Sequence, residues 1–459
     1  MVDYKVENSS FRDPSGFLFY HNQNIYRQIN KSYKENYDQL IDSGLYDQLV
    51  QSGLLIPHKE VDISPPKKDD FYKIIQPEQI SFISYPYEWS FSQLKQAALT
   101  TLEIQKIAMK YEMTLKDASV YNIQFKENKS LLIDTLSLEK YEEGQPWKAY
   151  KQFCQHFMAP LALMCHKDIR LNQLFRIYVD GIPLDLASAL LPTKTHAMFS
   201  LLTHIHVHAK SQKRYEHKQA DVKKISLSKR SFEGVIQSLQ SGISKMKWNF
   251  TDTEWGDYYS DTNYSDESFS HKKEIVKDSI TKIKPKMVWD LGANTGVFSR
   301  LASEQNIPTI AFDVDPVAVE KNYLDCKKNN EKNLLPLLLD LTNPSPYLGW
   351  ENKERVSFME RGPTDMVLAL ALIHHLAISN NLPFERIAQF FQKICRYLVI
   401  EFIPKNDSQI QRLLATREDI FVDYNQEEFE AAFGKYFEIV ESISIKNSER
   451  IVYNMKNKL

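Results

Sequence analysis

Three aspartates in the C-terminal half of the sequence each follow a short apolar run. Asp290 opens the stretch DLGANTG, Asp313 follows IAF, and Asp340 follows LLL. Continuous runs of this kind are typical of parallel strands that are buried on both faces. Ligands of such sheets bind at the carboxyl ends of the strands. Carboxylates at these positions suit a ligand that carries positive charge and sugar hydroxyls.

The turn after Asp290 contains two glycines four residues apart, Gly292 and Gly296. They let the backbone turn sharply and approach a ligand closely. A dinucleotide fingerprint would need further glycines where Asn294 and Val297 stand, and a phosphate loop would need a Gly-Lys-Ser/Thr ending. Nicotinamide, flavin and ATP are therefore disfavoured at this turn. S-Adenosylmethionine, with its ammonium and sulfonium groups, suits the charge of Asp290.

From about Trp255 to the C-terminus, the sequence resembles the class I S-adenosylmethionine-dependent methyltransferases. DLGANTG is similar to their first motif, with Asn294 where a glycine is common. Asp313 matches their ribose-binding acid, and Asp340-Leu341 their adenine-side motif. The resemblance implies S-adenosyl-L-methionine as cofactor and the following cofactor-binding residues: Asp290, Gly292, Ala293, Asn294, Gly296, Asp313, Val314, Asp340 and Leu341.

An aromatic segment precedes the first of these strands and contains Trp255, Tyr258, Tyr259 and Tyr264. In the family that the sequence resembles, a lid from this position often covers the cofactor. Aromatic rings there would shield a sulfonium by cation–π contact. Ordinary packing of a helix is the alternative.

The stretch ALALIHHLAIS after the fourth predicted strand carries His374 and His375. Many family members that methylate amide or base nitrogens have an Asn/Asp-Pro-Pro-aromatic motif there. An imidazole at the mouth of the site can accept a proton from a hydroxyl or carbon acid. A base of this kind favours oxygen or a small molecule as acceptor. The alternative for the two histidines is structural: one packs under the sheet and the other caps a helix. Glu401, at the end of the fifth strand, is a further candidate for substrate contact.

A second set of polar residues lies in the N-terminal half. Asp117 and Asn122 are five residues apart, and Asp134 follows the apolar run LLI. Their spacing resembles protein-kinase-like phosphotransferases, where one Asp positions the acceptor hydroxyl and the Asn and second Asp hold magnesium. The resemblance implies a kinase-like domain with a site at Asp117, Asn122 and Asp134.

This N-terminal sequence also departs from the kinase pattern. The residues before Asp117 are Leu115-Lys116, and those after Asp134 are Thr135-Leu136. No G-x-G-x-x-G loop precedes the first hairpin, and Tyr26-Arg27-Gln28 stands where the third-strand lysine is expected. The pattern therefore fits a divergent kinase-like fold whose activity is lost or altered, and the alternative is a helix-turn-strand packing unit.

Three histidines lie two apart in THIHVHAK, at His204, His206 and His208. On a strand they would share one face, but no Cys, Asp or Glu is close enough in sequence to complete a metal site. A packed or solvated role is favoured, and no metal site is predicted.

The elements that position these residues follow from the hydrophobic pattern. After about residue 246, apolar runs alternate with amphipathic helices, which predicts an α/β doubly wound, seven-stranded Rossmann-like sheet. Its end, YFEIVESISIKNSERIVYNMK, predicts an antiparallel hairpin. The N-terminal half predicts a mixed α+β domain with a hairpin turning at His21–Asn24, helices near 33–51 and 90–110, two short strands, and helices over 147–191.

Length and composition limit the possible domain organisation, partners and location of the protein. The 459 residues predict an N-terminal domain over 1–213, a connector with a surface helix over 214–245, where apolar residues are too sparse for a core face, and a methyltransferase domain over 246–459. With 57 basic and 59 acidic residues, nucleic acid is not favoured as a partner. The first 16 residues are polar and lack the apolar core of a secretory signal, so export is not expected. The longest apolar run, 366–373, is far shorter than the ~20 residues of a membrane helix.

These observations predict a two-domain cytoplasmic methyltransferase that acts on an unidentified acceptor, a small molecule in preference to nucleic acid, with no membrane partner. Two alternatives remain open. One is a kinase-like phosphotransferase with an appended cofactor-binding domain, and the other is a non-catalytic scaffold that binds the cofactor.

Overall fold

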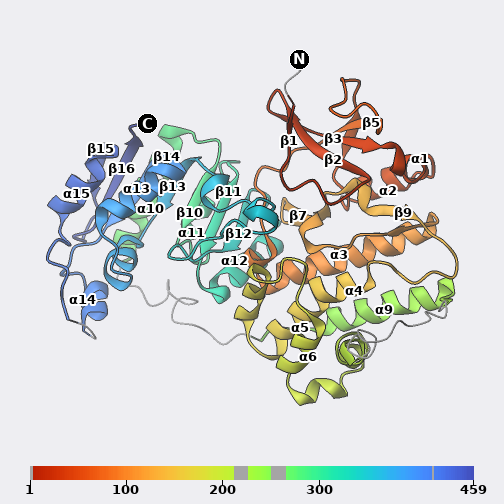
Figure 1. The fold of residues 1–459 in the computed structure, drawn as a ribbon. Coiled ribbons are helices and arrows are strands. Elements are labelled where there is room, and N and C mark those ends of the chain that lie inside the picture. Colours follow the sequence, from red (N-terminus) through yellow and green to blue (C-terminus); the bar gives the residue numbers. More distant parts are fainter. Residues whose placement is uncertain (1–3, 211–225, 250–264, 416–417) are drawn as a thin grey trace. The chain divides into compact units, whose positions relative to one another are not determined.

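The structure, a computed structural model, describes residues 4–210, 226–249, 265–415 and 418–459. Its contacts divide the chain into two compact units (Figure 1). The first unit contains Met1–Asn249 and Tyr347–Arg355, and the second contains Phe250–Pro346 and Val356–Leu459. None of the helices in the described residues combines the length and apolar character that a membrane crossing needs.

In the described residues, the second unit is built on one sheet of seven strands in the order β12-β11-β10-β13-β14-β16-β15. The first five strands in this order are parallel, and β16 pairs antiparallel with both β14 and β15. The α/β class and the terminal hairpin are therefore confirmed, as is the resemblance to class I methyltransferases at the level of the fold. The strands are β10 (Val288–Leu291), β11 (Thr309–Asp313), β12 (Leu334–Leu338), β13 (Thr364–Ala369), β14 (Cys395–Phe402), β15 (Phe437–Ser444) and β16 (Ile451–Asn457).

Helices follow the strands of this sheet, as a doubly wound fold requires. Local sequence fixes several of their starts: Asp315 accepts from Val317 N at 2.9 Å and Pro316 is the first residue of α12. The helices are α10 (Asp266–Ile283), α11 (Val297–Ser303), α12 (Pro316–Lys328), α13 (Phe384–Ile394), α14 (Ser408–Leu414) and α15 (Gln426–Gly434).

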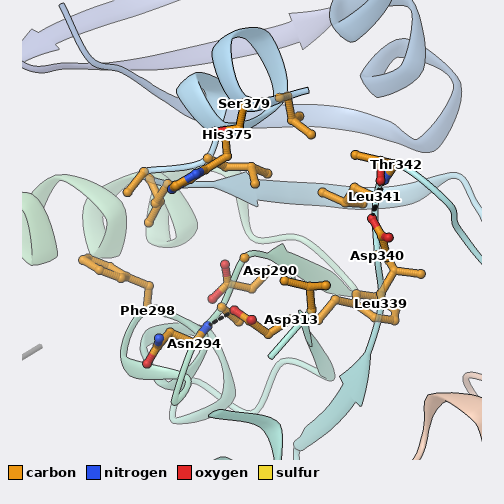
Figure 2. Close-up of a pocket in the computed structure, with 18 of the residues that line it drawn as sticks. Asp290, Asn294, Phe298, Asp313, Leu339, Asp340, Leu341, Thr342, His375 and Ser379 are labelled. Atoms are coloured by element: carbon orange, nitrogen blue, oxygen red, sulfur yellow. Dashed lines mark hydrogen bonds between the residues drawn. The ribbon is translucent and has the colours of Figure 1, made fainter. Parts of the chain in front are cut away.

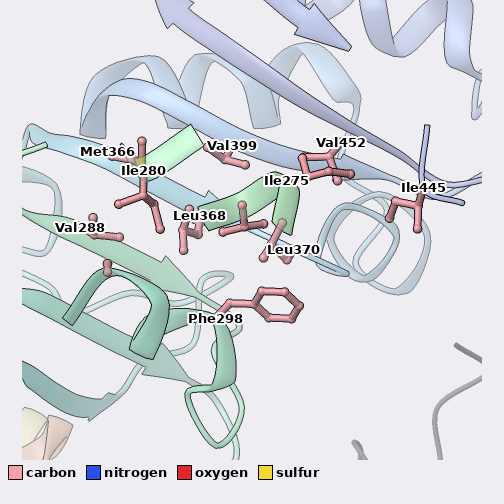
Figure 3. Close-up of a cluster of buried hydrophobic side chains, with 12 residues drawn as sticks. Ile275, Ile280, Val288, Phe298, Met366, Leu368, Leu370, Val399, Ile445 and Val452 are labelled. Atoms are coloured by element: carbon pink, nitrogen blue, oxygen red, sulfur yellow. The ribbon is translucent and has the colours of Figure 1, made fainter. Parts of the chain in front are cut away.

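A cluster of buried apolar side chains joins this sheet to α10 and α11 (Figure 3). Burying each of these side chains contributes roughly 1.5–3 kcal/mol. The cluster fixes α10 and α11 beside the carboxyl end of β10, where the predicted site lies. Its labelled members include Ile275, Ile280, Val288, Phe298, Met366, Leu368, Leu370, Val399 and Val452.

The first unit begins with an antiparallel sheet in the order β1-β2-β3-β5-β4. The predicted hairpin is confirmed, because His21 pairs with Asn24 across a turn in which Asn22 and Gln23 have positive φ. The elements are β1 (Lys5–Val6), β2 (Gly16–His21), β3 (Asn24–Asn30), α1 (Lys34–Asp42), α2 (Leu45–Gln51), β4 (His58–Glu60) and β5 (Phe71–Pro77).

The predicted long helix follows as α3 (Phe91–Lys110), and a capping box between Ser90 and Gln93 starts it. Two antiparallel pairs come next, β6 with β9 and β7 with β8. This order of a small sheet, a long helix and two short pairs agrees with the kinase-like fold that the resemblance implies. The strands are β6 (Met113–Leu115), β7 (Ile123–Lys126), β8 (Lys129–Leu132) and β9 (Leu138–Lys140).

The rest of the first unit is mainly helical: α4 (Tyr150–Phe153), α5 (Ala159–His166), α6 (Leu184–Leu190), α7 (Phe199–Leu201) and α9 (Lys229–Lys245). The predicted division at 213 and 246 stays a prediction, and the contacts place α9 in the first unit. The interpretation that 214–245 is too poor in apolar residues for a core face is wrong for α9. Its apolar residues recur on one helical face and are buried: Phe232, Ile236, Leu239 and Ile243.

Candidate functional site

The turn between β10 and α11 adopts left-handed backbone at three positions, with φ of 79° at Gly292, 51° at Asn294 and 82° at Gly296. A Cβ at Gly296 would lie 2.6 Å from Asn322 Nδ2, so only glycine fits there. Asn294 stands where the methyltransferase motif commonly has glycine. Since asparagine tolerates left-handed backbone better than most residues, this departure leaves the turn intact.

A cavity of about 390 Å³ opens at the carboxyl ends of β10, β11 and β12, and Asp290, Asp313 and Asp340 all line it (Figure 2). The structure thus brings the three predicted acids to one cavity. Gly296 is absent from its lining, and a Cβ at this position would point at Asn322. The other predicted cofactor residues that line the cavity are Gly292, Ala293, Asn294, Val314 and Leu341.

The carboxylate of Asp313 is held by the backbone on both sides. Its Oδ2 accepts from Asn294 N at 2.7 Å and its Oδ1 accepts from Asp315 N at 2.9 Å. A carboxylate has about four lone-pair sites, so Asp313 can accept from a ligand hydroxyl beside its backbone donors. Removal from water in the cavity raises the pKa of Asp313 to about 6, against the lowering effect of these hydrogen bonds.

Asp290 is buried below the turn, and Ser299 Oγ donates to its Oδ2 at 2.6 Å. Burial, and then the nearby charge of Asp313, raises the pKa of Asp290 to about 7. Two carboxylates that are costly to ionise in one cavity are suited to a ligand that brings positive charge and hydroxyl donors. Asp340 lies at the exposed rim, where it accepts from Thr342 N at 2.8 Å and Thr342 Oγ1 at 2.6 Å.

A buried lysine, Lys272 on α10, also lines the cavity, and sequence reasoning missed it. Its Nζ donates to Glu401 Oε2 at 2.7 Å and lies 4.8 Å from the centre of the Phe298 ring. Burial lowers the pKa of Lys272, while Glu401 opposes this effect. The signal that could have found it is a lysine one turn before the apolar residues Ile275 and Val276 of an amphipathic helix.

Glu401, a sequence candidate for substrate contact, has no exposed surface and is not among the residues that line the cavity. Besides Lys272, its Oε2 accepts from Ala371 N at 2.7 Å, and its Oε1 lies 3.7 Å from Arg450 NH1. Ala371 lines the cavity with a φ of 50°, which is left-handed for a residue with a Cβ. Glu401 therefore fixes both a cation and a strained turn at the cavity wall.

The two histidines lie after β13, where the turn η12 (His375–Ser379) begins. His375 lines the cavity and His374 does not, although their rings are 4.1 Å apart. Burial lowers the pKa of His375 to about 4, so its ring is neutral at neutral pH. His374 is buried, and its Nδ1 has no hydrogen-bond partner among the described residues. Only His375 is placed to meet a ligand in this cavity.

In the first unit the structure brings Asp117, Asn122 and Asp134 together. Asn122 Nδ2 donates to Ser137 Oγ at 3.2 Å, and Ser137 Oγ donates to Asp134 Oδ2 at 2.9 Å. Burial, and then the charge of Asp134, raises the pKa of Asp117, which a hydrogen bond with Asn122 partly offsets. Arg27 of β3, at the position where a lysine is expected, pairs with Asp134 Oδ1 at 2.5 Å.

The three spaced histidines are helical and packed. His204 lies between Tyr150 Oη at 2.7 Å and Ser238 Oγ at 2.9 Å, so both nitrogens of its ring have partners. His206 lies between Ser188 Oγ at 2.8 Å and Thr195 Oγ1 at 3.0 Å. Within the part of the chain that the structure describes, no group of three His, Cys, Asp or Glu is arranged to hold a metal ion.

The predicted aromatic lid, Trp255, Tyr258, Tyr259 and Tyr264, lies outside the described residues.

Comparisons with known proteins add a relative that spans nearly the whole chain. No family model matches. Among solved structures, the bifunctional kinase-methyltransferase WbdD is 13% identical, with a TM-score of 0.29 over 42% of this chain and 40% of that chain. Magnesium protoporphyrin IX methyltransferase from Synechocystis PCC 6803, with bound SAH, is 14% identical, with a TM-score of 0.31 over 44% of this chain and 91% of that one. TM-scores of this size add nothing about function.

The nodulation protein NoeA of Rhizobium meliloti (strain 1021) is 35% identical over 462 residues. The match covers 97% of this chain and 95% of NoeA, so it includes both units. The chain therefore belongs to the NoeA family.

Proposed function

We propose that the second unit binds S-adenosyl-L-methionine and transfers its methyl group to an acceptor. The observation that carries this proposal is the meeting of Asp290, Asp313 and Asp340 around one cavity at three neighbouring strand ends. Bound there, the cofactor supplies an electrophilic methyl group on a sulfonium. The chain's own task is to align an acceptor with that carbon and to exclude water.

The cavity offers each part of the cofactor a fitting partner. Asp340 at the rim is assigned to the adenine amino group, and Asp313, whose carboxylate is oriented by backbone donors, is assigned to the two ribose hydroxyls. Asp290, deepest of the three, is assigned to the charged amino-acid end. This order runs along the three strands from β12 to β10.

Lys272 is the residue that we assign to the carboxylate of the methionine tail. Replacing Lys272 with methionine keeps most of its length and removes the charge. We expect S-adenosylmethionine to bind roughly tenfold more weakly, because one charge-assisted hydrogen bond is lost. Calorimetry with 5′-methylthioadenosine, which has no amino-acid tail, provides the control. Equal weakening of both ligands would mean that Lys272 acts only by holding the cavity wall.

Cofactor affinity is expected to fall in acid. The pKa of Asp290 is raised to about 7 and that of Asp313 to about 6 in the ligand-free protein. A cation and hydroxyl donors favour the ionised carboxylates, so binding releases protons that both groups hold at low pH. The dissociation constant is expected to rise about 100-fold from about pH 8 to about pH 5.5. Calorimetry in two buffers of different ionisation enthalpy measures the proton release, and a pH-independent constant would contradict these assignments.

The acceptor is proposed to be a small molecule with a neutral hydroxyl group. Beyond the three aspartates, the cavity is lined by the apolar Leu370, Leu372 and Leu376, and by the polar His375 and Ser379. A neutral imidazole can take the hydroxyl proton as the new bond forms. Among the described residues that line the cavity, the carboxylates are the three aspartates assigned to the cofactor, which supports a neutral hydroxyl over an ammonium as the acceptor. We propose His375, and not His374, as the catalytic residue.

Two measurements test the methyltransferase proposal. Calorimetry on the full chain should detect binding of S-adenosylmethionine and of S-adenosylhomocysteine. Incubating a metabolite extract with cofactor that carries a labelled methyl group should then yield a labelled product by mass spectrometry. The absence of any cofactor binding would refute the proposal. The name of the relative NoeA gives no acceptor chemistry, and a location in the cytoplasm stays a prediction.

One observation favours a second candidate, phosphotransfer by the first unit. Asp117, Asn122 and Asp134 gather as a kinase-like site requires. Against it, Arg27 occupies an oxygen of Asp134 that magnesium would need. Calorimetry with Mg-ATP on the wild type and on Asp134→Ala distinguishes phosphotransfer from a scaffold role. Binding that depends on Asp134 supports phosphotransfer, and no binding leaves the first unit as a scaffold.

A further inference from the structure

A second cavity, of about 670 Å³, lies in the first unit and has no part in the functions above. It is formed by Arg12, by the helical residues Lys151 and Gln155, by the loop 177–183 and by the segment 349–351. Two large apolar side chains are exposed at it: Trp350 is 65% exposed and Ile177 is 71% exposed. An exposed indole at the edge of a cavity is a feature that binding sites share.

Trp350 is carried by a loop with an unfavourable backbone. Gly349, Glu351 and Asn352 have φ of 84°, 54° and 57°. A Cβ at position 349 would lie 2.6 Å from the Cβ of Glu354, so glycine is required there. Left-handed backbone at Glu351 persists only where the surroundings over-determine it, and such positions gather at functional sites.

The surroundings that hold this loop are identifiable. Glu354 is 4% exposed, and its Oε1 accepts from Trp350 N at 2.8 Å and from Arg12 NH2 at 2.6 Å. Leu348 and Arg355 exchange two backbone hydrogen bonds of 3.1 Å that close the loop. The guanidinium of Arg355 lies 4.1 Å from the centre of the Tyr121 ring. The backbone that carries the indole is therefore held in place, which lowers the entropy lost on binding.

The charged side chains around the cavity indicate which class of ligand fits it. The lining contains the cations Arg12 and Lys151, the anions Asp180 and Glu351 and the neutral amide of Gln155, and Arg12 is already paired with Glu354 and Glu351 with Lys353. A phosphate would meet two carboxylates, and an apolar chain would strip water from charged groups without replacing their hydrogen bonds. A sugar ring avoids both costs, because it has an apolar face of C–H groups and a rim of hydroxyls.

We infer that this cavity binds a saccharide, with one ring stacked on Trp350 and its hydroxyls bonded to the surrounding charged and amide side chains. The site lies wholly in the first unit, so the inference is independent of the proposed methyl transfer. Stacking on the indole supplies affinity, and the polar groups supply selectivity.

Saturation-transfer NMR on the full chain tests this inference, with the neutral trisaccharides maltotriose, cellotriose and tri-N-acetylchitotriose as probes and inorganic pyrophosphate as the anionic competitor. We expect saturation to reach the ring C–H protons of at least one trisaccharide, and we expect pyrophosphate not to displace it. Trp350→Ala should weaken binding at least tenfold, as loss of an aromatic anchor does, and Trp350→Phe should recover part of it.

Phe199→Ala is the matched control, since Phe199 is 72% exposed in the same unit and lines a different cavity. It should leave trisaccharide binding unchanged. Circular dichroism confirms that the variants remain folded. The inference is overturned if no trisaccharide receives saturation from the wild type, if pyrophosphate displaces the bound sugar, or if Trp350→Ala binds as well as the wild type.

Discussion

Replacing Asp313 with alanine is expected to weaken S-adenosylmethionine binding by at least about 100-fold, because two charge-assisted hydrogen bonds to the ribose are lost together. Asp313 is the best placed of the three acids for this test. Its two oxygens are fixed by Asn294 N and Asp315 N, so the carboxylate needs no rearrangement when a ligand arrives. Calorimetry gives the dissociation constants.

The matched control for this prediction is Asp325→Ala, on the exposed side of the neighbouring helix α12. It removes one negative charge from the same unit without touching the cavity, and its affinity should equal that of the wild type. Thermal unfolding of both variants separates loss of the site from loss of the fold. An unchanged dissociation constant for Asp313→Ala would remove Asp313 from the site and with it the proposed placement of the ribose.

Replacing Glu401 with alanine is expected to destabilise the second unit by about 3–5 kcal/mol, the usual cost of removing one partner of a buried ion pair. The variant removes a buried acceptor that Lys272 and Ala371 N share, and it removes a carboxylate near Arg450. Hydrogen exchange of the β14 and β16 amides reports the stability of this unit directly.

Two comparison variants make the Glu401 prediction specific. Glu385→Ala breaks an exposed pair with Lys435 and is expected to leave the stability of this unit nearly unchanged, because solvent screens exposed pairs. The double replacement Lys272→Met with Glu401→Leu removes both charges, and should recover much of the stability that Glu401→Ala loses. If the single and double variants are equally unstable, the pairing of Lys272 with Glu401 is not what stabilises this region.

The strand ends of the second unit could be predicted because their signals are local. Asp290, Asp313 and Asp340 each follow an apolar run, and parallel strands bring their carboxyl ends to one edge whatever the loops between them do. The same rule predicted that a histidine after β13 would line the cavity, and His375 does. The rule could not tell His375 from His374, because adjacent residues in a helical turn face different directions.

Lys272 could not be found in this way, since its role depends on Glu401, which is 129 residues further along the chain. The buried face of α9 was missed because its four apolar residues are separated by charged and small residues, which make the segment polar on average. In the first unit, the spacing of Asp117, Asn122 and Asp134 could be recognised in the sequence. The pairing of Arg27 with Asp134 joins positions 107 residues apart, and no sequence period encodes it.

The segment Tyr347–Arg355 packs within the first unit although the strands before and after it, β12 and β13, belong to the second. Each unit is therefore built from two separate stretches of the chain, and neither can be made as one continuous fragment. A fragment ending at residue 249 would leave Arg12 without the carboxylate of Glu354, and one beginning at residue 250 would carry a nine-residue loop without its packing partners. Separate expression of the halves would thus understate the stability of both, and a functional split of this chain requires transplanting the loop along with the first half.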